Sequence, residues 1–300
     1  MTDYLVGTGG WAYFNVPNKS SLKAYSEIFN FVEVNYTFYQ YPTIQTVEKW
    51  RRAVPSEFIF SVRCHQELTH RIGLKPTDEA YEAFYKMKTY AATLQTPYLV
   101  LETPATFMAT NETRGFFSTL NLKGVRLVWE YRAPMTRIVT KLMQDFSIIH
   151  CVDLSRERPS YSSDVTYARL FGKGQHNIYQ FTNDELLEIQ QQAEETNSKK
   201  VLMSYHGLRM NNDALRFQQH LTTGKFLPAT SAIGLDSAKS VLAEDAVFPS
   251  SKFELMKAQG WKVIDVRENE TAHLAEYLGI MPEKSYCSLE DVLKELEVVL

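Results

Sequence analysis

Short apolar runs alternate with amphipathic stretches along roughly the first 220 residues of the chain. Most runs are apolar at successive positions, which is typical of parallel strands that helices cover on both faces. This pattern predicts eight strands, at residues 4–8, 31–35, 58–64, 98–102, 125–132, 148–153, 165–170 and 201–205. The stretches between them predict helices at residues 20–29, 43–53, 78–94, 111–120, 136–144, 183–196 and 211–220. The sixth connection, residues 153–164, is predicted to be a loop.

Eight strands with mostly helical crossovers predict an α/β fold, a TIM-type (β/α)8 barrel over residues 1–221. A doubly wound open sheet is the alternative. After residue 221 the rhythm changes to a loop rich in small residues, helical patterns at 251–259, 270–277 and 288–299, and a strand at 261–266. We expect residues 222–300 to form a small accessory α+β module, or an extension that covers the barrel and does not fold alone.

Composition and charge narrow the class of protein. With 300 residues, 44% of them hydrophobic and 22% charged, the chain is not of the disordered type. Its 32 basic and 35 acidic residues give a net charge of -3, so nucleic acid binding would need a local basic patch. The first residues do not show the basic and apolar pattern of a signal peptide, so we do not expect secretion. No apolar run reaches about 20 residues, and three separated cysteines fit a reducing compartment. We therefore expect a cytoplasmic protein without a membrane partner, whose oligomeric state stays open.

Polar residues end nearly every predicted strand. In a barrel these positions share one mouth, where the active sites of this fold lie. The set comprises Glu33, Asn35, Arg63, His65, Glu102, Glu130, Arg132, Asp153, Arg169 and His206. A guanidinium stays charged, so a buried arginine needs a carboxylate, a phosphate or several acceptors. The three arginines therefore either pair with Glu33, Glu130 and Asp153 in a stabilising ring or form a pocket for an anion.

Our leading hypothesis is an enzyme, a hydrolase or an isomerase, that acts on a small phosphorylated or otherwise anionic substrate such as a sugar or nucleotide derivative. Glu33, Glu130 and Asp153 are the predicted catalytic residues, acting as general acid or base. Glu130 and Arg132 are two residues apart in one strand, so they share a face and can share a pocket. The predicted substrate-binding residues are Trp11, Asn35, Tyr39, Arg63, His70, Arg132, Arg169 and His206.

Three other hypotheses stay open. A non-catalytic protein would recognise nucleic acid or a damaged base with the mouth and the aromatic residues at 36–41. A glycosidase would use Glu102 and Glu130 as its carboxylate pair. A metal-dependent barrel of the endonuclease or isomerase kind would draw divalent-metal ligands from strand-end glutamates, aspartate and histidines. We predict no cofactor, because no HxH, HExxH or paired-cysteine spacing occurs and arginines at the mouth repel a divalent cation.

Several motifs resemble those of the YecE-like family, a group of proteins classed as a domain of unknown function (number seventy-two). The motifs are GTGGW at 7–11, EVNYTFY at 33–39, FIFSVR at 58–63, LTH at 68–70, EYR at 130–132 and RLFG at 169–172. The resemblance covers most of the first 220 residues. It implies a TIM barrel similar in architecture to sugar isomerases and apurinic endonucleases, without a settled activity. The chain departs from the family pattern with Glu102, where glutamine is common, and with His206-Gly207 in place of an asparagine pair.

Overall fold

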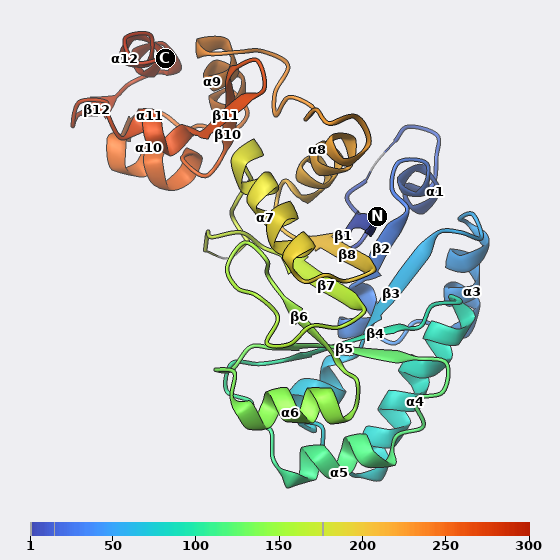
Figure 1. The fold of residues 1–300 in the computed structure, drawn as a ribbon. Coiled ribbons are helices and arrows are strands. Elements are labelled where there is room, and N and C mark those ends of the chain that lie inside the picture. Colours follow the sequence, from blue (N-terminus) through green and yellow to red (C-terminus); the bar gives the residue numbers. More distant parts are fainter. Residues whose placement is uncertain (1, 15, 176) are drawn as a thin grey trace. The chain divides into compact units, whose positions relative to one another are not determined.

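The computed structural model describes residues 2–14, 16–175 and 177–300. Eight parallel strands pair in chain order and close into a barrel, because β1 also pairs with β8, with Asp3 opposite Lys200 and Thr8 opposite Tyr205 (Figure 1). The strands are β1 (Asp3–Thr8), β2 (Phe31–Val34), β3 (Ile59–Arg63), β4 (Tyr98–Thr103), β5 (Arg126–Tyr131), β6 (Ile149–Val152), β7 (Val165–Leu170) and β8 (Lys200–Tyr205). The predicted α/β TIM-type barrel is confirmed.

The helices of the predicted crossovers are all present. They are α1 (Ser21–Ser26), α3 (Ile44–Arg52), α4 (Asp78–Thr93), α5 (Asn111–Thr119), α6 (Arg137–Asp145), α7 (Asn183–Glu195) and α8 (Met210–Thr223). Thr43, Thr77 and Thr136 cap α3, α4 and α6 by accepting a backbone N–H, as threonine at this position does in many helices. Two further elements were not predicted, the short helix α2 (Tyr36–Tyr39) and the π-helix η1 (Glu67–Arg71). The sixth connection is a loop, as predicted.

The barrel interior is layered because successive side chains of a strand point to opposite faces. A buried, mostly apolar cluster fills part of this interior and consists of Leu5, Phe31, Tyr98, Val100, Val128, Ile149, Cys151, Val165, Tyr167 and Leu202. Two residues further along β2, β4, β5 and β7 stand Glu33, Glu102, Glu130 and Arg169. The inward face of these strands therefore changes from apolar to charged toward their carboxyl ends.

The contact between β1 and β2 depends on a glycine and a tyrosine. A Cβ on Gly7 would lie 1.9 Å from the carbonyl oxygen of Phe31, so only glycine fits there. The hydroxyl of Tyr25 in α1 accepts the N–H of Thr8 at 2.8 Å and donates to the carbonyl of Phe31 at 2.9 Å. This fully buried tyrosine thus ties the two strands together.

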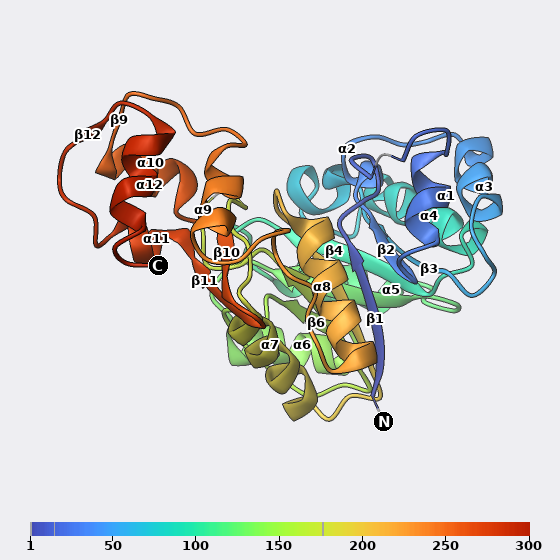
Figure 2. The same ribbon diagram turned by 90° about the horizontal axis from the view of Figure 1, so that it is seen from above.

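The chain divides into two compact units, residues 1–170 with 192–205 and residues 171–191 with 206–300. The second unit contains α8, α9 (Leu235–Leu242), α10 (Lys252–Gln259), α11 (Leu274–Leu278) and α12 (Leu289–Leu296), of which α9 to α12 gather in one cluster (Figure 2). It also holds two antiparallel pairs, β10 (Val263–Arg267) with β11 (Glu270–His273) and β9 (Ser250–Ser251) with β12 (Ser285–Tyr286). The helix predicted at 270–277 is therefore wrong in its first half, because residues 270–273 pair with β10. Helix α9 lies in the segment expected to be a loop.

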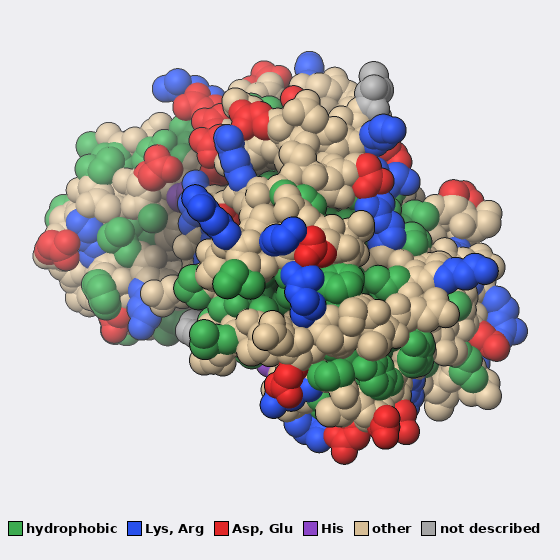
Figure 3. Space-filling model, turned by 60° about the horizontal axis from the view of Figure 1, so that its bottom comes forward, with side chains coloured by type: hydrophobic (Ala, Val, Ile, Leu, Met, Phe, Trp, Pro, Cys, Tyr) green, Lys and Arg blue, Asp and Glu red, His purple; other side chains and the backbone are tan. Residues whose placement is uncertain are grey.

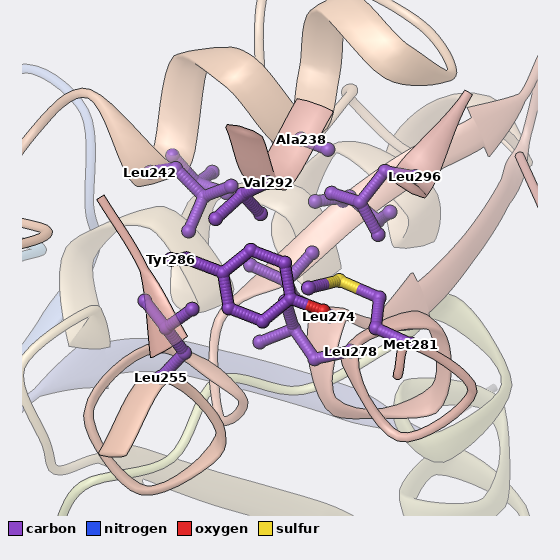
Figure 4. Packing of buried hydrophobic residues seen from close by; sticks show 11 residues of the cluster. Ala238, Leu242, Leu255, Leu274, Leu278, Met281, Tyr286, Val292 and Leu296 are labelled. Atoms are coloured by element: carbon purple, nitrogen blue, oxygen red, sulfur yellow. The ribbon is translucent and has the colours of Figure 1, made fainter. Parts of the chain in front are cut away.

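The second unit has its own apolar core. Figure 4 shows the ring of Tyr286 among Leu255, Leu274, Leu278 and Met281, and all five side chains are buried. The Tyr286 hydroxyl donates to the carbonyl of Pro282 at 2.9 Å, which satisfies its polar end. Among the residues described, no helix is both long and apolar enough to cross a membrane.

Candidate functional site

Arg169 on β7 stands at the centre of a buried ion-pair network at the carboxyl ends of the strands. Its Nη2 lies 3.1 Å from Glu33 Oε1, its Nη1 lies 2.6 Å from Glu102 Oε2, and Nη1 also contacts Glu130 Oε2. Only 2% of the Arg169 side chain is exposed. One cation thus holds three carboxylates from β2, β4 and β5 in place.

Glu102 on β4 is the second centre of the network, since it contacts all three strand-end arginines. Its Oε2 also pairs with Arg63 Nη2, and its Oε1 lies 2.9 Å from Arg132 Nη1. Arg132 closes the ring through Nε, which lies 2.7 Å from Glu130 Oε1. Three arginines and three glutamates therefore balance in charge. The ring was predicted to include Asp153, but the structure has Glu102 in that role.

The network is buried at one end and open at the other. The side chains of Glu33, Glu102 and Arg63 are at most 8% exposed, whereas 14% of Glu130 and 40% of Arg132 are exposed. Glu33 also accepts a hydrogen bond of 2.8 Å from Tyr167, which lies two residues before Arg169 on the same face of β7. Tyr167 was missed as a member of the site, although this spacing could have identified it. Arg132 and Glu130 are therefore more accessible to solvent than Glu33, Glu102, Arg63 and Arg169.

Charge compensation outweighs burial for two members of the network, Glu130 and Arg169. Burial alone raises the pKa of Glu130, but Arg169 and Arg132 outweigh it and hold this pKa below its usual value. Burial opposes the charge of Arg169, yet Glu130, Glu33 and Glu102 raise its pKa well above the usual value. Glu130 is therefore a carboxylate at neutral pH, which suits it to accept a proton and not to donate one.

Asn35, Phe38 and His70 border the network on the side of β2 and β3. Asn35 Oδ1 accepts a hydrogen bond of 3.1 Å from Arg63, and its Nδ2 donates to the carbonyl of Gly9 at 2.7 Å. The Arg63 guanidinium lies over the ring of Phe38, 3.6 Å from its centroid. His70 packs edge-on against Phe38 at 5.3 Å, and burial, with Arg63 and Arg132 nearby, lowers its pKa. The structure thus brings Asn35 into contact with the network and places His70 beside it.

The other predicted residues lie in different surroundings. Trp11 packs edge-on against Trp50 at 5.3 Å, and Tyr39 is 61% exposed. Asp153 accepts two hydrogen bonds from Ser155, of 2.9 and 2.6 Å, within its own loop. His206, which follows β8, stacks on Phe171 at 4.6 Å, and both belong to the second compact unit.

The geometry bears on the metal and glycosidase hypotheses. Over the described ranges, no group of three or more His, Cys, Asp and Glu side chains is arranged to hold a metal ion. Arg169 Nη1 contacts both Glu102 and Glu130, so a guanidinium occupies the space between these two carboxylates. A glycosidase needs that space for the sugar and, in inverting enzymes, for water. The buried thiols of Cys64 and Cys151 have raised pKa values because of burial, which makes them poor nucleophiles.

A closed barrel of eight parallel strands with a charged layer at their carboxyl ends defines a TIM-barrel protein with its candidate site at the mouth. The family model described as "Protein of unknown function DUF72" matches residues 5–232. The chain belongs to the DUF72 family, which confirms the family expected from the sequence motifs.

Individual relatives agree with this assignment. A stretch of 101 residues, 31% of this chain, is 32% identical to UPF0759 protein YunF of Bacillus subtilis (strain 168), and it spans 34% of that protein's length. The crystal structure of a DUF72 family protein (EF0366) from Enterococcus faecalis V583 matches with a TM-score of 0.59 and 16% identity, covering 74% of this chain and 98% of that one. The crystal structure of a DUF72 family protein (TM1631) from Thermotoga maritima MSB8 matches with a TM-score of 0.58 and 16% identity. This match covers 73% of this chain and 99% of that one. At such low identity these structures show the fold alone.

Proposed function

We propose that the barrel mouth binds a small anionic molecule and that the protein is an enzyme using general acid–base chemistry on it. One observation carries the proposal: Arg132 is half-exposed at the edge of an otherwise buried network, 2.7 Å from the carboxylate of Glu130. A partly exposed guanidinium offers donors to a phosphate or carboxylate with little further desolvation. The adjacent carboxylate is suited to proton transfer.

The buried part of the network supports this role as a scaffold. Replacing buried ion pairs by apolar residues is often neutral or stabilising by about 1–4 kcal/mol, so such a network adds little to the stability of a fold. Charged groups held rigidly in a dry site do preorganise a field for a reacting anion. We assign Arg169, Glu102 and Glu33 to positioning, since Glu33 lies fully buried beneath Arg169.

The chemistry assigned to Glu130 and Arg132 is hydrolytic or isomerising. Glu130 takes a proton from water or from a carbon beside the anionic group. The Arg132 guanidinium stabilises the negative charge that develops as the proton leaves. Both roles fit one pocket, because the two side chains stand on the same face of β5 and its continuation.

The experiment compares two arginines at opposite ends of β5. Arg132→Met removes the proposed anion contact, whereas Arg126→Met removes a surface arginine that pairs with Asp164 at 2.6 Å. Inorganic phosphate is titrated into each protein by calorimetry at low ionic strength. We expect at least tenfold weaker binding for Arg132→Met and unchanged binding for Arg126→Met. Equal phosphate affinity in both variants and in the unmodified chain, or no binding to any of the three, would overturn the proposal.

Binding of nucleic acid is favoured less by this geometry. Such binding draws most of its affinity from a basic surface that follows the phosphate backbone. On the face drawn in Figure 3, lysine and arginine side chains lie interspersed with acidic, apolar and neutral ones. Only Arg132 among the network's arginines is substantially exposed, which suits a single anionic group better than a polymer.

A further inference from the structure

A recess of about 350 Å³ lies in the barrel unit beside the ion-pair network. One wall comes from η1 and the turn after it, with Thr69, His70 and Gly73. The facing wall comes from the loop between β4 and α5, with Thr106 and Phe107. Pockets for small molecules typically measure about 300–1,000 Å³, so the recess has room for a small ligand or for one part of it.

The recess continues the mouth of the barrel along two strands. Its first wall follows β3, which ends in Arg63, and its second wall begins at Pro104, two residues after Glu102 of β4. His70 lines the recess and packs against Phe38, the ring beneath the Arg63 guanidinium. One ligand can therefore reach the network and the recess together.

The wall at Phe107 contacts β5, the strand that carries Glu130 and is followed directly by Arg132. Tyr131, which stands between these two residues, donates a hydrogen bond of 3.3 Å to the carbonyl of Phe107. The rings of Tyr131 and Trp129 also pack edge-on against Phe107, each at 6.1 Å. These contacts with β5 thus hold the wall of the recess in a fixed position relative to Glu130.

The lining of the recess suits a neutral polar group. Its lysine and its glutamate, Lys75 and Glu112, pair with each other at 3.7 Å and cancel in charge. The lowered pKa of His70 keeps this ring neutral at neutral pH. Threonine hydroxyls and an aromatic edge complete the surface, a combination that binds hydroxyl groups and the apolar face of a sugar ring.

We propose that the recess binds the neutral, hydroxyl-bearing part of the molecule whose anionic group contacts Arg132, so that the substrate class is a small phosphorylated sugar. This inference rests on the proposed function, which assigns the binding of the anionic group of the substrate to Arg132. His70 stands where the two parts of the substrate meet. Its Nδ1 is engaged with the Thr69 hydroxyl at 2.9 Å, which orients the ring.

The test uses two probes, inorganic phosphate and ribose 5-phosphate, titrated by calorimetry. Thr106→Trp fills the recess from an exposed position, and Met108→Trp does so from a second exposed lining position. Ala105→Trp is the matched control, because Ala105 is exposed in the same turn but does not line the recess. Thermal unfolding of each variant confirms that it is folded.

We expect ribose 5-phosphate to bind the unmodified chain at least tenfold more tightly than phosphate. Thr106→Trp and Met108→Trp should bring the two affinities within twofold of each other, while Ala105→Trp keeps the difference. The recess inference is wrong, and the proposed function stands, if phosphate binding requires Arg132 but ribose 5-phosphate binds the unmodified chain no more tightly than phosphate does. The same conclusion follows if ribose 5-phosphate still binds more tightly than phosphate in Thr106→Trp and Met108→Trp. If neither probe binds the unmodified chain, both are wrong.

Discussion

Replacing Arg169 by methionine tests whether the ion-pair network is the coupled unit that its geometry indicates. The change leaves Glu33, Glu102 and Glu130 buried without the cation that contacts all three. Removing one partner of a buried pair typically costs about 3–5 kcal/mol, so we expect Arg169→Met to lower the free energy of unfolding by about that amount near neutral pH.

The loss in Arg169→Met should depend on pH in a defined direction. Without Arg169, one cation fewer opposes the burial that raises the pKa of Glu130, so this carboxyl takes up a proton more readily and the folded variant loses less stability as the pH falls. In the unmodified chain the pKa of Glu130 is lowered, so its stabilising contribution is instead lost in acid. The difference in stability between the two proteins should therefore shrink from about pH 8 to about pH 5.

The assay is urea unfolding followed by tryptophan fluorescence. Both proteins carry Trp261→Phe, which leaves Trp11, Trp50 and Trp129 as probes, all in the barrel unit. Arg126→Met serves as the control, since its ion pair with Asp164 lies at the surface and should be worth less than about 1 kcal/mol. The reasoning would be refuted if Arg169→Met lowers the free energy of unfolding no more than Arg126→Met does and keeps the pH dependence of the unmodified chain.

Three further predictions concern stability. Tyr25→Phe removes the hydroxyl that ties β1 to β2, and thermal unfolding should show a loss of about 1–3 kcal/mol, against little change for the exposed Tyr85→Phe. Burial raises the pKa of Asp213 from 3.8 to about 7, so the folded chain keeps a proton that the unfolded chain releases. Urea unfolding should show stability falling as the pH rises through this interval, and Asp213→Asn should abolish the trend. Truncation after Leu221 removes residues 222–300, which form the second unit together with residues 171–191 and 206–221. The product should aggregate, as light scattering would show, because apolar surface becomes exposed. A soluble product that unfolds cooperatively would instead show that the barrel folds independently.

The barrel could be predicted from the sequence because its strands are buried on both faces and read as apolar runs. The failures fall where local pattern competes with other interactions. Residues 270–273 continue a helical pattern but pair with β10, and tertiary pairing decides their conformation. Helix α9 follows Gly234 and contains Ser237 and Ser240, and the weak helix propensities of glycine and serine favour a loop. The π-helix η1 has no recognisable sequence signal.

The sequence pattern predicted some members of the ion-pair network, but it did not predict which side chains pair with each other. Period-two alternation places Glu102, Glu130 and Arg169 at one mouth, because each follows an inward apolar residue by two positions. Which carboxylate meets which arginine depends on barrel register, and this brought Glu102 to the centre. The recess could not be predicted, since its walls are loops whose conformation is set by contacts distant in sequence, such as that of Tyr131 with Phe107.

Closure of the barrel between β1 and β8 has a consequence for synthesis on the ribosome. The two strands are about 200 residues apart in the chain, so at about 5–20 residues per second β1 is made roughly 10–40 s before its second neighbour. During that interval one edge of β1 lacks the partner to which it later bonds, and open strand edges invite pairing with other chains. The nascent protein is therefore most exposed to aggregation before residue 205 emerges and β8 can pair with this edge of β1.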